Sequence, residues 1–319
     1  MPRLVEAGHL RVQSVGYGDS PMSQRALLLT VLLIAALIGA NFSVLKFALD
    51  HTTPFLLTSM RTVIGGIFLL VVAFARGERL PTKMRDYVNI FVVGFSITTV
   101  SSALLISGVD RVPAGLASLV ASTMPLFTAV LTFALLRHST SRLGQVGLAV
   151  GFIGAVVLAS PSLGGETTTI GIISLLFSAL AWAFGTVYLK WQDFSHISPI
   201  MLVGVQLIMS ALMLVPFALV VEGTSGTQWG IGLLVPLLYA AIPANAVTFS
   251  LMATVVKRAT PTVAASTAYL IPVFGVFFGW LFRSEVLGLV ELAGGLLVVV
   301  GVYLVVTANA AAAKAPLGS

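Results

Sequence analysis

The sequence predicts an all-α integral membrane protein whose ten transmembrane helices form two inverted five-helix repeats. Three observations support this prediction. Hydrophobic residues make up 58% of the chain and charged residues only 9%, whereas soluble domains carry roughly 25% charged residues. Ten apolar segments each come close to the length of about 20 residues that a helix needs to cross a bilayer. A pattern of residues in the first half also recurs in the second half.

The composition also excludes several kinds of site. So few charged residues cannot cover a water-facing surface, and the mean hydropathy of +1.05 makes lipid the expected solvent. The net charge of +6 does not indicate nucleic-acid binding, because the basic residues lie in short connections between apolar segments. The chain has no cysteine, which excludes disulfides and thiolate metal ligands. We therefore predict no metal and no cofactor, and the expected partners are the lipid bilayer and a small-molecule solute.

Ten apolar segments follow one another along the chain. They cover residues 26–48, 53–75, 88–108, 112–136, 143–160, 170–190, 198–221, 231–256, 259–282 and 286–308. Several of the connections are only a few residues long, which makes neighbouring helices antiparallel. A polar tail precedes the helices and an Ala-rich tail follows them. The predicted divisions are a tail (1–24), a first repeat (25–160), a second repeat (168–308) and a second tail (309–319).

The distribution of Lys and Arg predicts the orientation in the membrane, because cytoplasmic loops are enriched in these residues. If the N-terminus lies in the cytoplasm, most basic residues fall on the inner side, and only Arg111 and Arg283 fall in outer connections. We therefore expect a multi-pass protein of the cell membrane, in bacteria the plasma membrane, with both termini in the cytoplasm.

The recurring pattern relates the two halves by a shift of 147 residues. The shift aligns Arg111 with Arg258, Pro125 with Pro272, Phe127 with Phe274 and Gly154 with Gly301. Each half contains an odd number of helices, so the second half enters the membrane from the opposite side. Inverted repeats of this kind are common in transporters, which bind their solute near the midplane between the halves.

A family resemblance rests on residues 38–42 with Lys46, on Arg61, on the small residues before Pro125, and on Pro272 followed by residues 283–285. With these residues and the glycines of the last helix, the chain resembles the ten-helix EamA-type branch of the drug/metabolite transporter superfamily over about 26–308. It departs from the family at Ile38, which is often Trp, and at residues 137–139, where an acid is common. The resemblance implies transport of small metabolites.

Two prolines are predicted to lie in the middle of helices, at matched places of the two halves. Pro125 and Pro272 each remove one backbone hydrogen bond and leave the carbonyl four residues earlier unbonded. In lipid such carbonyls must be satisfied by protein or face a watered cavity. We interpret the prolines as gating positions around a central cavity; a packing kink without a ligand is the alternative.

Polar and aromatic residues of the apolar segments are candidates for lining this cavity. They are Asn41, Thr98, Ser101, Ser102, Ser122, Trp182, Tyr188, Tyr239, Asn245, Thr248 and Tyr269. The repeat matches Thr98 with Asn245 and Ser101 with Thr248, so these pairs are the strongest candidates for binding a solute. The alternative for the hydroxyls is a hydrogen bond to their own helix backbone.

Two basic residues lie inside apolar segments. An intramembrane charge indicates a functional site by default, so Arg61 is a candidate, with a structural clamp on backbone carbonyls as the alternative. The residue matched to Arg61 is Gln206, which is uncharged. Lys46 is close enough to the helix end to reach the membrane surface with its amine, or else it attracts an anionic solute.

Glycines of the fifth segment fall on one helix face, at positions 144, 147, 151 and 154. Small residues let helices approach closely in membranes. This row predicts packing against the tenth helix, or against another subunit in a possible homodimer.

The sequence therefore predicts a secondary transporter for small metabolites, such as amino-acid-like solutes or drugs. Export by alternating access around a cavity between the repeats is the expected mechanism. The chain has no GxxxxGK[ST] phosphate-binding loop, so ATP-driven transport by this chain alone is not expected. The alternatives are a structural or sensory membrane protein and, less favoured, an intramembrane enzyme. The enzyme would need clustered carboxylates or a Ser/His pair that the apolar segments lack.

Overall fold

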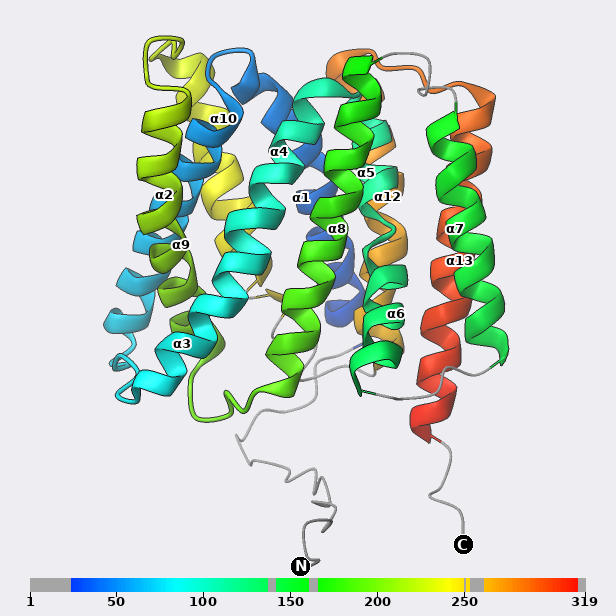
Figure 1. Ribbon diagram of the computed structural model, residues 1–319, viewed down its shortest axis with the longest axis horizontal. Coiled ribbons are helices and arrows are strands. Elements are labelled where there is room, and N and C mark those ends of the chain that lie inside the picture. Colours follow the sequence, from blue (N-terminus) through cyan, green and yellow to red (C-terminus); the bar gives the residue numbers. More distant parts are fainter. Residues whose placement is uncertain (1–23, 137–141, 161–165, 250, 253–260, 315–319) are drawn as a thin grey trace, which may run out of the picture.

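The computed structural model describes residues 24–136, 142–160, 166–249, 251–252 and 261–314. Throughout these residues the regular structure is helical, and the helices stand side by side in one bundle (Figure 1). The first predicted tail (1–24) lies almost wholly outside the described residues, whereas residues 309–314 of the second predicted tail continue the last helix. The all-helical architecture that the sequence predicts is therefore confirmed.

The first half of the chain supplies five helical segments. The helices are α1 (Gln24–Leu49), α2 (Pro54–Ala75), α3 (Met84–Val93) continued by η1 (Gly94–Ser101) and α4 (Ser102–Arg111), α5 (Ala114–Ala121) followed by α6 (Met124–Leu136), and α7 (Arg142–Ala159). The element η1 is a π-helix, which has a wider turn than an α-helix.

The second half supplies five more segments in the described part of the chain. They are α8 (Glu166–Trp191), α9 (Pro199–Val221), α10 (Ile231–Ala241) continued by the π-helix η3 (Ile242–Val247), α12 (Pro261–Arg283) and α13 (Leu289–Lys314). Six of the ten segments are long and apolar enough to cross a membrane over their described residues, and the other four contain shorter apolar helices.

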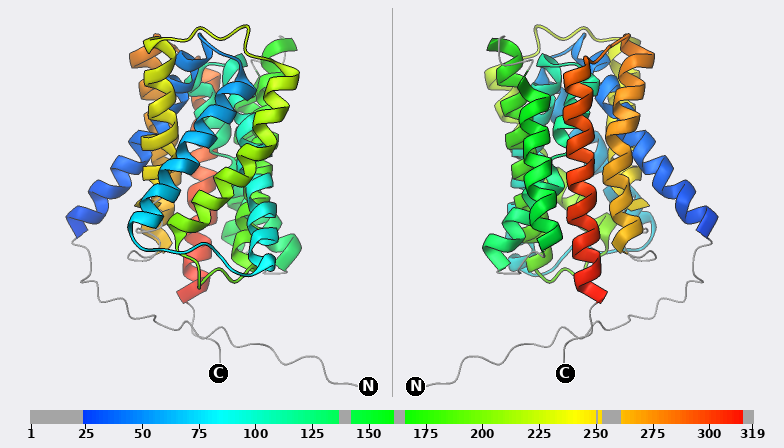
Figure 2. Two further views of the ribbon diagram at one scale, coloured as in Figure 1. Left: turned by 90° about the vertical axis from the view of Figure 1, so that its left-hand side faces the viewer. Right: turned by 90° about the vertical axis from the view of Figure 1, so that its right-hand side faces the viewer.

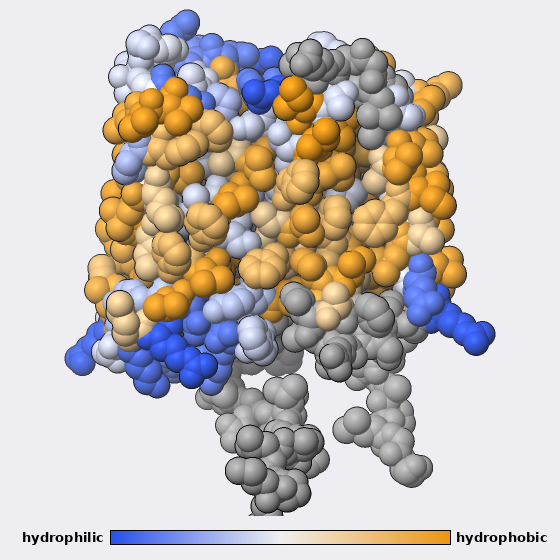
Figure 3. All heavy atoms as spheres, viewed as in Figure 1, coloured by the Kyte–Doolittle hydropathy of each residue, from blue (hydrophilic) through white to orange (hydrophobic). Residues whose placement is uncertain are grey.

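The sides of the bundle are apolar and exposed. Large side chains such as Leu29, Leu212 and Val220 are 66–86% exposed. Figure 3 shows an apolar band between two polar ends. Monomeric soluble proteins do not expose apolar surface on this scale. The band is the lipid-facing surface of an integral membrane protein.

Helices at matched places of the two halves pack against each other. α2 packs along α9, and α7 packs along α13. α1 packs against α12 and α10, while α8 correspondingly packs against α6 and α4. The bundle is thus built from contacts between the halves, as a two-repeat membrane protein requires.

α2 and α9 also begin and end in the same way. Each starts with a proline, Pro54 or Pro199, at a position where the missing N–H costs no helical hydrogen bond. Each is followed by a glycine with a positive φ, +75° at Gly77 and +66° at Gly223. Glycine is the usual residue for this left-handed conformation after a helix.

The glycine row of α7 packs inside the chain. A Cβ atom added to Gly147 would lie 2.8 Å from the carbonyl oxygen of Gly301, and one added to Gly154 would lie 2.6 Å from the amide nitrogen of Val298. Any larger residue would push α13 away. The prediction of close packing between these two segments is confirmed.

The fourth segment differs from its prediction. A turn at Ser122 and Thr123 divides it, so Pro125 lies in the first turn of α6 rather than in the middle of a helix. The first turn of a helix has free N–H groups, and a proline there breaks no hydrogen bond. Pro272, its match in the second half, does lie inside the continuous helix α12. The expectation of two equivalent mid-helix prolines is therefore wrong for Pro125.

α1 begins and α13 ends at the same end of the bundle, which we call the tail end; the opposite end is the far end (Figure 1). The largest core cluster occupies the half of the bundle near the far end. It includes Leu45, Leu57, Ile106, Leu116, Leu175 and Leu237. Toward the tail end, the first half of α1 leans away from the bundle (Figure 2). The far end is therefore the more tightly packed of the two.

Candidate functional site

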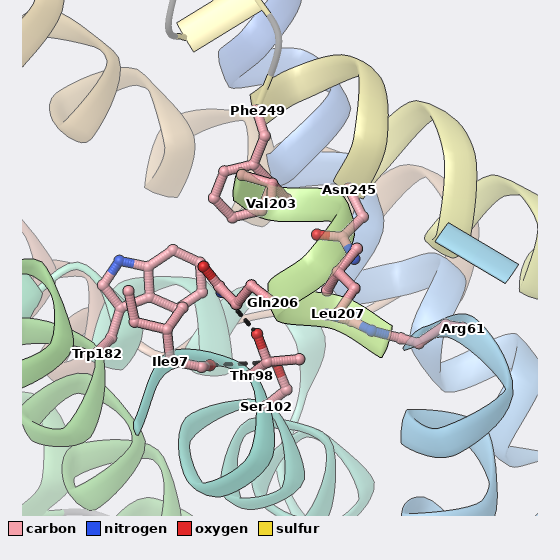
Figure 4. A pocket seen from close by; sticks show the side chains of 10 residues that line it. All are labelled: Arg61, Ile97, Thr98, Ser102, Trp182, Val203, Gln206, Leu207, Asn245 and Phe249. Carbon is pink, nitrogen blue, oxygen red and sulfur yellow. Dashed lines mark hydrogen bonds between the residues drawn. The ribbon is translucent and has the colours of Figure 1, made fainter. Parts of the chain in front are cut away.

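A small cavity lies between residues from the two halves of the bundle (Figure 4). The empty space between its lining residues is about 250 Å³, which includes space open to solvent. Its lining comes from α2, η1, α4, α8, α9, η3 and the helical residues after η3. The lining residues are Arg61, Ile97, Thr98, Ser102, Trp182, Val203, Gln206, Leu207, Asn245 and Phe249.

Both π-helices contribute to the cavity at matched positions. Thr98 lies in η1 and Asn245 in η3, and both line it. The residues four positions later, Ser102 and Phe249, line it too. In both halves, therefore, a residue of the π-helix and the residue four positions after it lie on the cavity side. π-helical segments often occur at functional sites, and here they occur twice at one site.

A hydrogen bond crosses the cavity wall between α9 and η1. Gln206 donates from Nε2 to Oγ1 of Thr98 at 2.8 Å (Figure 4). Both side chains are buried. This bond joins the second half of the chain to the first half at the polar side of the cavity.

Arg61 extends from α2 into the same cavity (Figure 4). Only 7% of its surface is exposed. Its Nε and one terminal nitrogen are buried without a hydrogen-bond partner among the described residues. Arg61 and Gln206, which the repeat matches, therefore line one cavity, but only Gln206 has a polar partner there.

An aromatic pair forms another wall. The rings of Trp182 and Phe249 stack with centroids 5.9 Å apart and planes at 17°. Ile97, Val203 and Leu207 add aliphatic surface. The cavity thus combines one cation, two amides and two hydroxyls with an apolar wall, and none of its lining residues is a carboxylate.

Several predicted hydroxyls bond to backbone carbonyls instead. Ser101 donates to the carbonyl of Ser178 at 2.8 Å, Ser122 to that of its own helix at 2.7 Å, and Thr248 likewise at 2.7 Å. These three residues do not line the cavity. The alternative of a bond to the own helix backbone therefore describes Ser122 and Thr248, whereas Ser101 bonds across to α8.

The predicted tyrosines and Asn41 also lie outside the cavity lining. Tyr188 donates to Oδ1 of Asn89 at 2.9 Å, and Tyr239 donates to a carbonyl of α1 at 3.0 Å. The Oδ1 atom of Asn41 is buried without a partner among the described residues. The side chain of Tyr269 lies outside the part of the chain that the structure describes.

Ionic contacts link the helix ends at the far end. Arg283 Nη1 lies 2.6 Å from a carboxylate oxygen of Asp50, and Lys46 Nζ lies 4.0 Å from Oε1 of Glu285. Lys46 is therefore placed at the far end and not in the cavity. The first pair joins the end of α12 to the α1–α2 connection, and the second joins α1 to the α12–α13 connection.

Glu285 also caps α5. Its two carboxylate oxygens accept hydrogen bonds from the amides of Ala114 at 2.9 Å and Gly115 at 3.0 Å. An anionic group at a helix N-terminus is stabilised by the free N–H groups and the helix dipole. One side chain thus joins α1, α5 and the end of α12.

Carboxylates cap the matched helices α2 and α9 in a similar way. Glu222 accepts hydrogen bonds from the amides of Phe55 at 3.0 Å and Leu56 at 2.9 Å at the far end. Glu78 accepts a hydrogen bond from the hydroxyl of Ser198, the N-cap of α9, at the tail end. Each half therefore supplies an acid that fixes the start of a helix in the other half.

A second, narrower cavity adjoins the first on its tail-end side. It has an empty volume of about 160 Å³ and is lined by Leu69, Pro199, Ile200, Val203 and Phe249. Val203 and Phe249 belong to both cavities. Pro199 starts α9 at the tail end, so the free space extends from the middle of the bundle toward that end.

The sequence does not single out the apolar lining residues Ile97, Val203, Leu207 and Phe249, because they resemble lipid-facing residues of the same segments. Gln206 could be found through its alignment with Arg61. Among the described residues, no group of three or more His, Asp or Glu side chains is placed to hold a metal.

The family model that matches this chain is that of the EamA-like transporter family, over residues 25–160 and again over residues 169–307. Uncharacterized transporter YvbV of Bacillus subtilis (strain 168) is 31% identical over 299 residues, which cover 93% of this chain and 96% of that protein. The "Probable amino-acid metabolite efflux pump" of Salmonella typhimurium (strain LT2) is 30% identical over 289 residues, which cover 86% of this chain and 92% of that protein.

A solved crystal structure with 19% sequence identity matches the fold with a TM-score of 0.64, covering 92% of this chain and 100% of that chain. The two relatives are named as a transporter and an efflux pump, and neither is named as an enzyme. Since the two matches of the family model cover nearly all of the helical segments, the chain belongs to the EamA-like transporter family.

Proposed function

We propose that the protein is a secondary carrier that exports small organic metabolites by alternating access around the central cavity. The observation that supports this proposal is that residues at matched positions of the two halves line one cavity. Arg61 and Gln206, and likewise Thr98 and Asn245, come from equivalent places in the two halves and line the same cavity. A site between two inverted repeats can face either side of a membrane when one half rocks against the other.

Export is the direction that the arrangement supports. The two cavities, which share Val203 and Phe249 in their walls, lie in series toward the tail end, while ionic contacts and helix caps join the elements of the far end. We place the tail end in the cytoplasm, because the connections there hold most of the Lys and Arg residues. A cytoplasmic solute would then reach the cavity first. A relative named as an efflux pump agrees with this direction.

Release on the other side requires the far end to open. Opening would separate Lys46 from Glu285 and Arg283 from Asp50, and would free the start of α5. Closure of the tail end would bring the first half of α1, which leans outward, back to the bundle (Figure 2). The repeats at 25–160 and 168–308 are the two units that we expect to move.

Efflux from vesicles tests the proposal. The purified full chain is reconstituted into vesicles loaded with a mixture of labelled amino acids and small carboxylic acids. We expect at least one solute to leave faster than from vesicles without protein, and Trp182→Ala to slow that release. Trp229→Ala, an exposed tryptophan outside the cavity, is the matched control. Equal release with and without protein for every solute would contradict the carrier function.

A further inference from the structure

The guanidinium of Arg61 is a buried charge that has no counter-ion among the described residues. Its Nε and one terminal nitrogen have no hydrogen-bond partner in the described part of the chain. The ion pairs found there join other residues: Lys46 with Glu285, Arg111 with Asp110, His196 with Asp86, and Arg283 with Asp50. The structural alternative, a clamp on backbone carbonyls, has no hydrogen bond to support it among the described residues.

Such a group needs a partner from outside the chain. Burying a charge without a counter-ion is strongly unfavourable. Charged residues inside membrane proteins accordingly face watered cavities or pathways, and they pair with other groups. Arg61 lines the central cavity, so a solute bound in that cavity would lie beside its guanidinium (Figure 4).

Resting on the carrier function proposed above, we propose that Arg61 binds the carboxylate of the transported solute. A guanidinium presents a planar fork of N–H donors that matches a carboxylate with two parallel hydrogen bonds. The cavity lining contains no carboxylate that would bind the Arg61 guanidinium in place of the solute. The solute class is a small carboxylate with an apolar body.

The rest of the lining supports this class. Trp182 and Phe249 present stacked rings, and aliphatic side chains continue the apolar surface. Gln206, at the matched place in the second half, is neutral and bonds to Thr98. The cavity therefore has one cationic side, at α2, and the carboxylate would bind there.

Four probes of similar size separate the contributions of charge and shape. Leucine and 4-methylpentanoate carry a carboxylate, 4-methylpentanamide is neutral, and 3-methylbutylamine is cationic. Binding to the purified full chain is measured from the rise of its unfolding temperature with the concentration of each probe. Flux of each probe is measured in vesicles. The wild-type chain should bind both carboxylates at least about tenfold more tightly than the amide or the amine.

Variants at Arg61 assign this preference to the guanidinium. Arg61→Gln should weaken carboxylate binding at least about tenfold and abolish the preference for 4-methylpentanoate over 4-methylpentanamide, while Arg61→Lys should retain part of it. Arg111→Gln, which removes an arginine outside the cavity, should leave the preference unchanged. If Arg61→Gln does not fold, the relative affinities of the wild-type chain for the four probes still test the proposal.

The proposal is overturned if the wild-type chain does not prefer the carboxylates, or if Arg61→Gln keeps the preference. If solutes of the mixture are still released from the vesicles, either of these results contradicts the role of Arg61 but not the carrier function. Carboxylate binding that depends on Arg61, without efflux of any solute, would instead overturn the carrier function and keep the site.

Discussion

Gln206 and Thr98, 108 residues apart in the chain, form a buried hydrogen bond of 2.8 Å between the two halves of the protein. The bond lies at the cavity wall and joins α9 to the π-helix η1. It therefore links the position matched to Arg61 with the position matched to Asn245. Substitutions at this cavity, and at the contacts that close it, should change solute flux in ways that distant substitutions do not.

Thr98→Val should lower the free energy of unfolding by about 1 kcal/mol, because it leaves the Gln206 amide without its partner. Solute flux should also fall, since the orientation of Gln206 is no longer fixed. Thr186→Val is the control, because the Thr186 hydroxyl bonds within its own helix, to the carbonyl of Trp182. Thermal unfolding in detergent and flux in vesicles measure both effects. Equal behaviour of the two variants would show that the bond has no special role.

Glu285→Ala should favour the form that is open at the far end. The change removes the cap of α5 and the partner of Lys46, and loss of a helix cap costs about 1 kcal/mol. A single cysteine at Ser118, buried in α5, should then react faster with a membrane-impermeant maleimide. Glu291→Ala, at an acid in the first turn of α13, is the control. No change in the labelling rate at position 118 argues against this gate.

Pro272→Ala should slow the interconversion of the two access states, and Pro125→Ala should not. Pro272 lies inside α12, where alanine restores a backbone hydrogen bond and stiffens the helix. Pro125 lies in the first turn of α6, where alanine adds no helical hydrogen bond. Solute binding should survive better than flux in Pro272→Ala. If both variants keep normal flux, the prolines serve packing alone.

The orientation can be tested with two matched substitutions, because the chain contains no cysteine. Ser195 and Ser225 are exposed in connections at the tail end and the far end respectively. An impermeant thiol reagent added to intact cells should label Ser225→Cys and leave Ser195→Cys unlabelled. The reverse pattern would place the tail end outside the cell and reverse the proposed direction of transport.

The sequence predicts more of the fold than of the site, for a physical reason. Long apolar segments and a repeat determine the helices and their inverted order, since a bilayer requires about 20 apolar residues per span. The side of a helix that faces a cavity depends on the local helix type. Ser101 and Thr248 are one α-helical turn after Thr98 and Asn245, but the π-helices turn them away, and Ser102 and Phe249 line the cavity instead.

The position of Pro125 could not be predicted from hydropathy either. Hydropathy is continuous across residues 112–136, so the break between α5 and α6 does not appear in it. A local signal was present, because threonine is a common residue just before a helix and proline is tolerated in the first helical turn. Arg61, by contrast, is conspicuous in the sequence as a charge in an apolar segment, and the structure places it in the cavity.

Chemical block of the cavity tests most directly whether solute passes between the two halves. Ser102→Cys places a single thiol on the cavity wall, and Ser160→Cys places one on the exposed end of the fifth segment. Treatment with N-ethylmaleimide should abolish solute efflux through Ser102→Cys, solute should slow this inactivation, and Ser160→Cys should keep its activity. Full efflux by Ser102→Cys protein whose thiol is completely modified would contradict transport through this cavity.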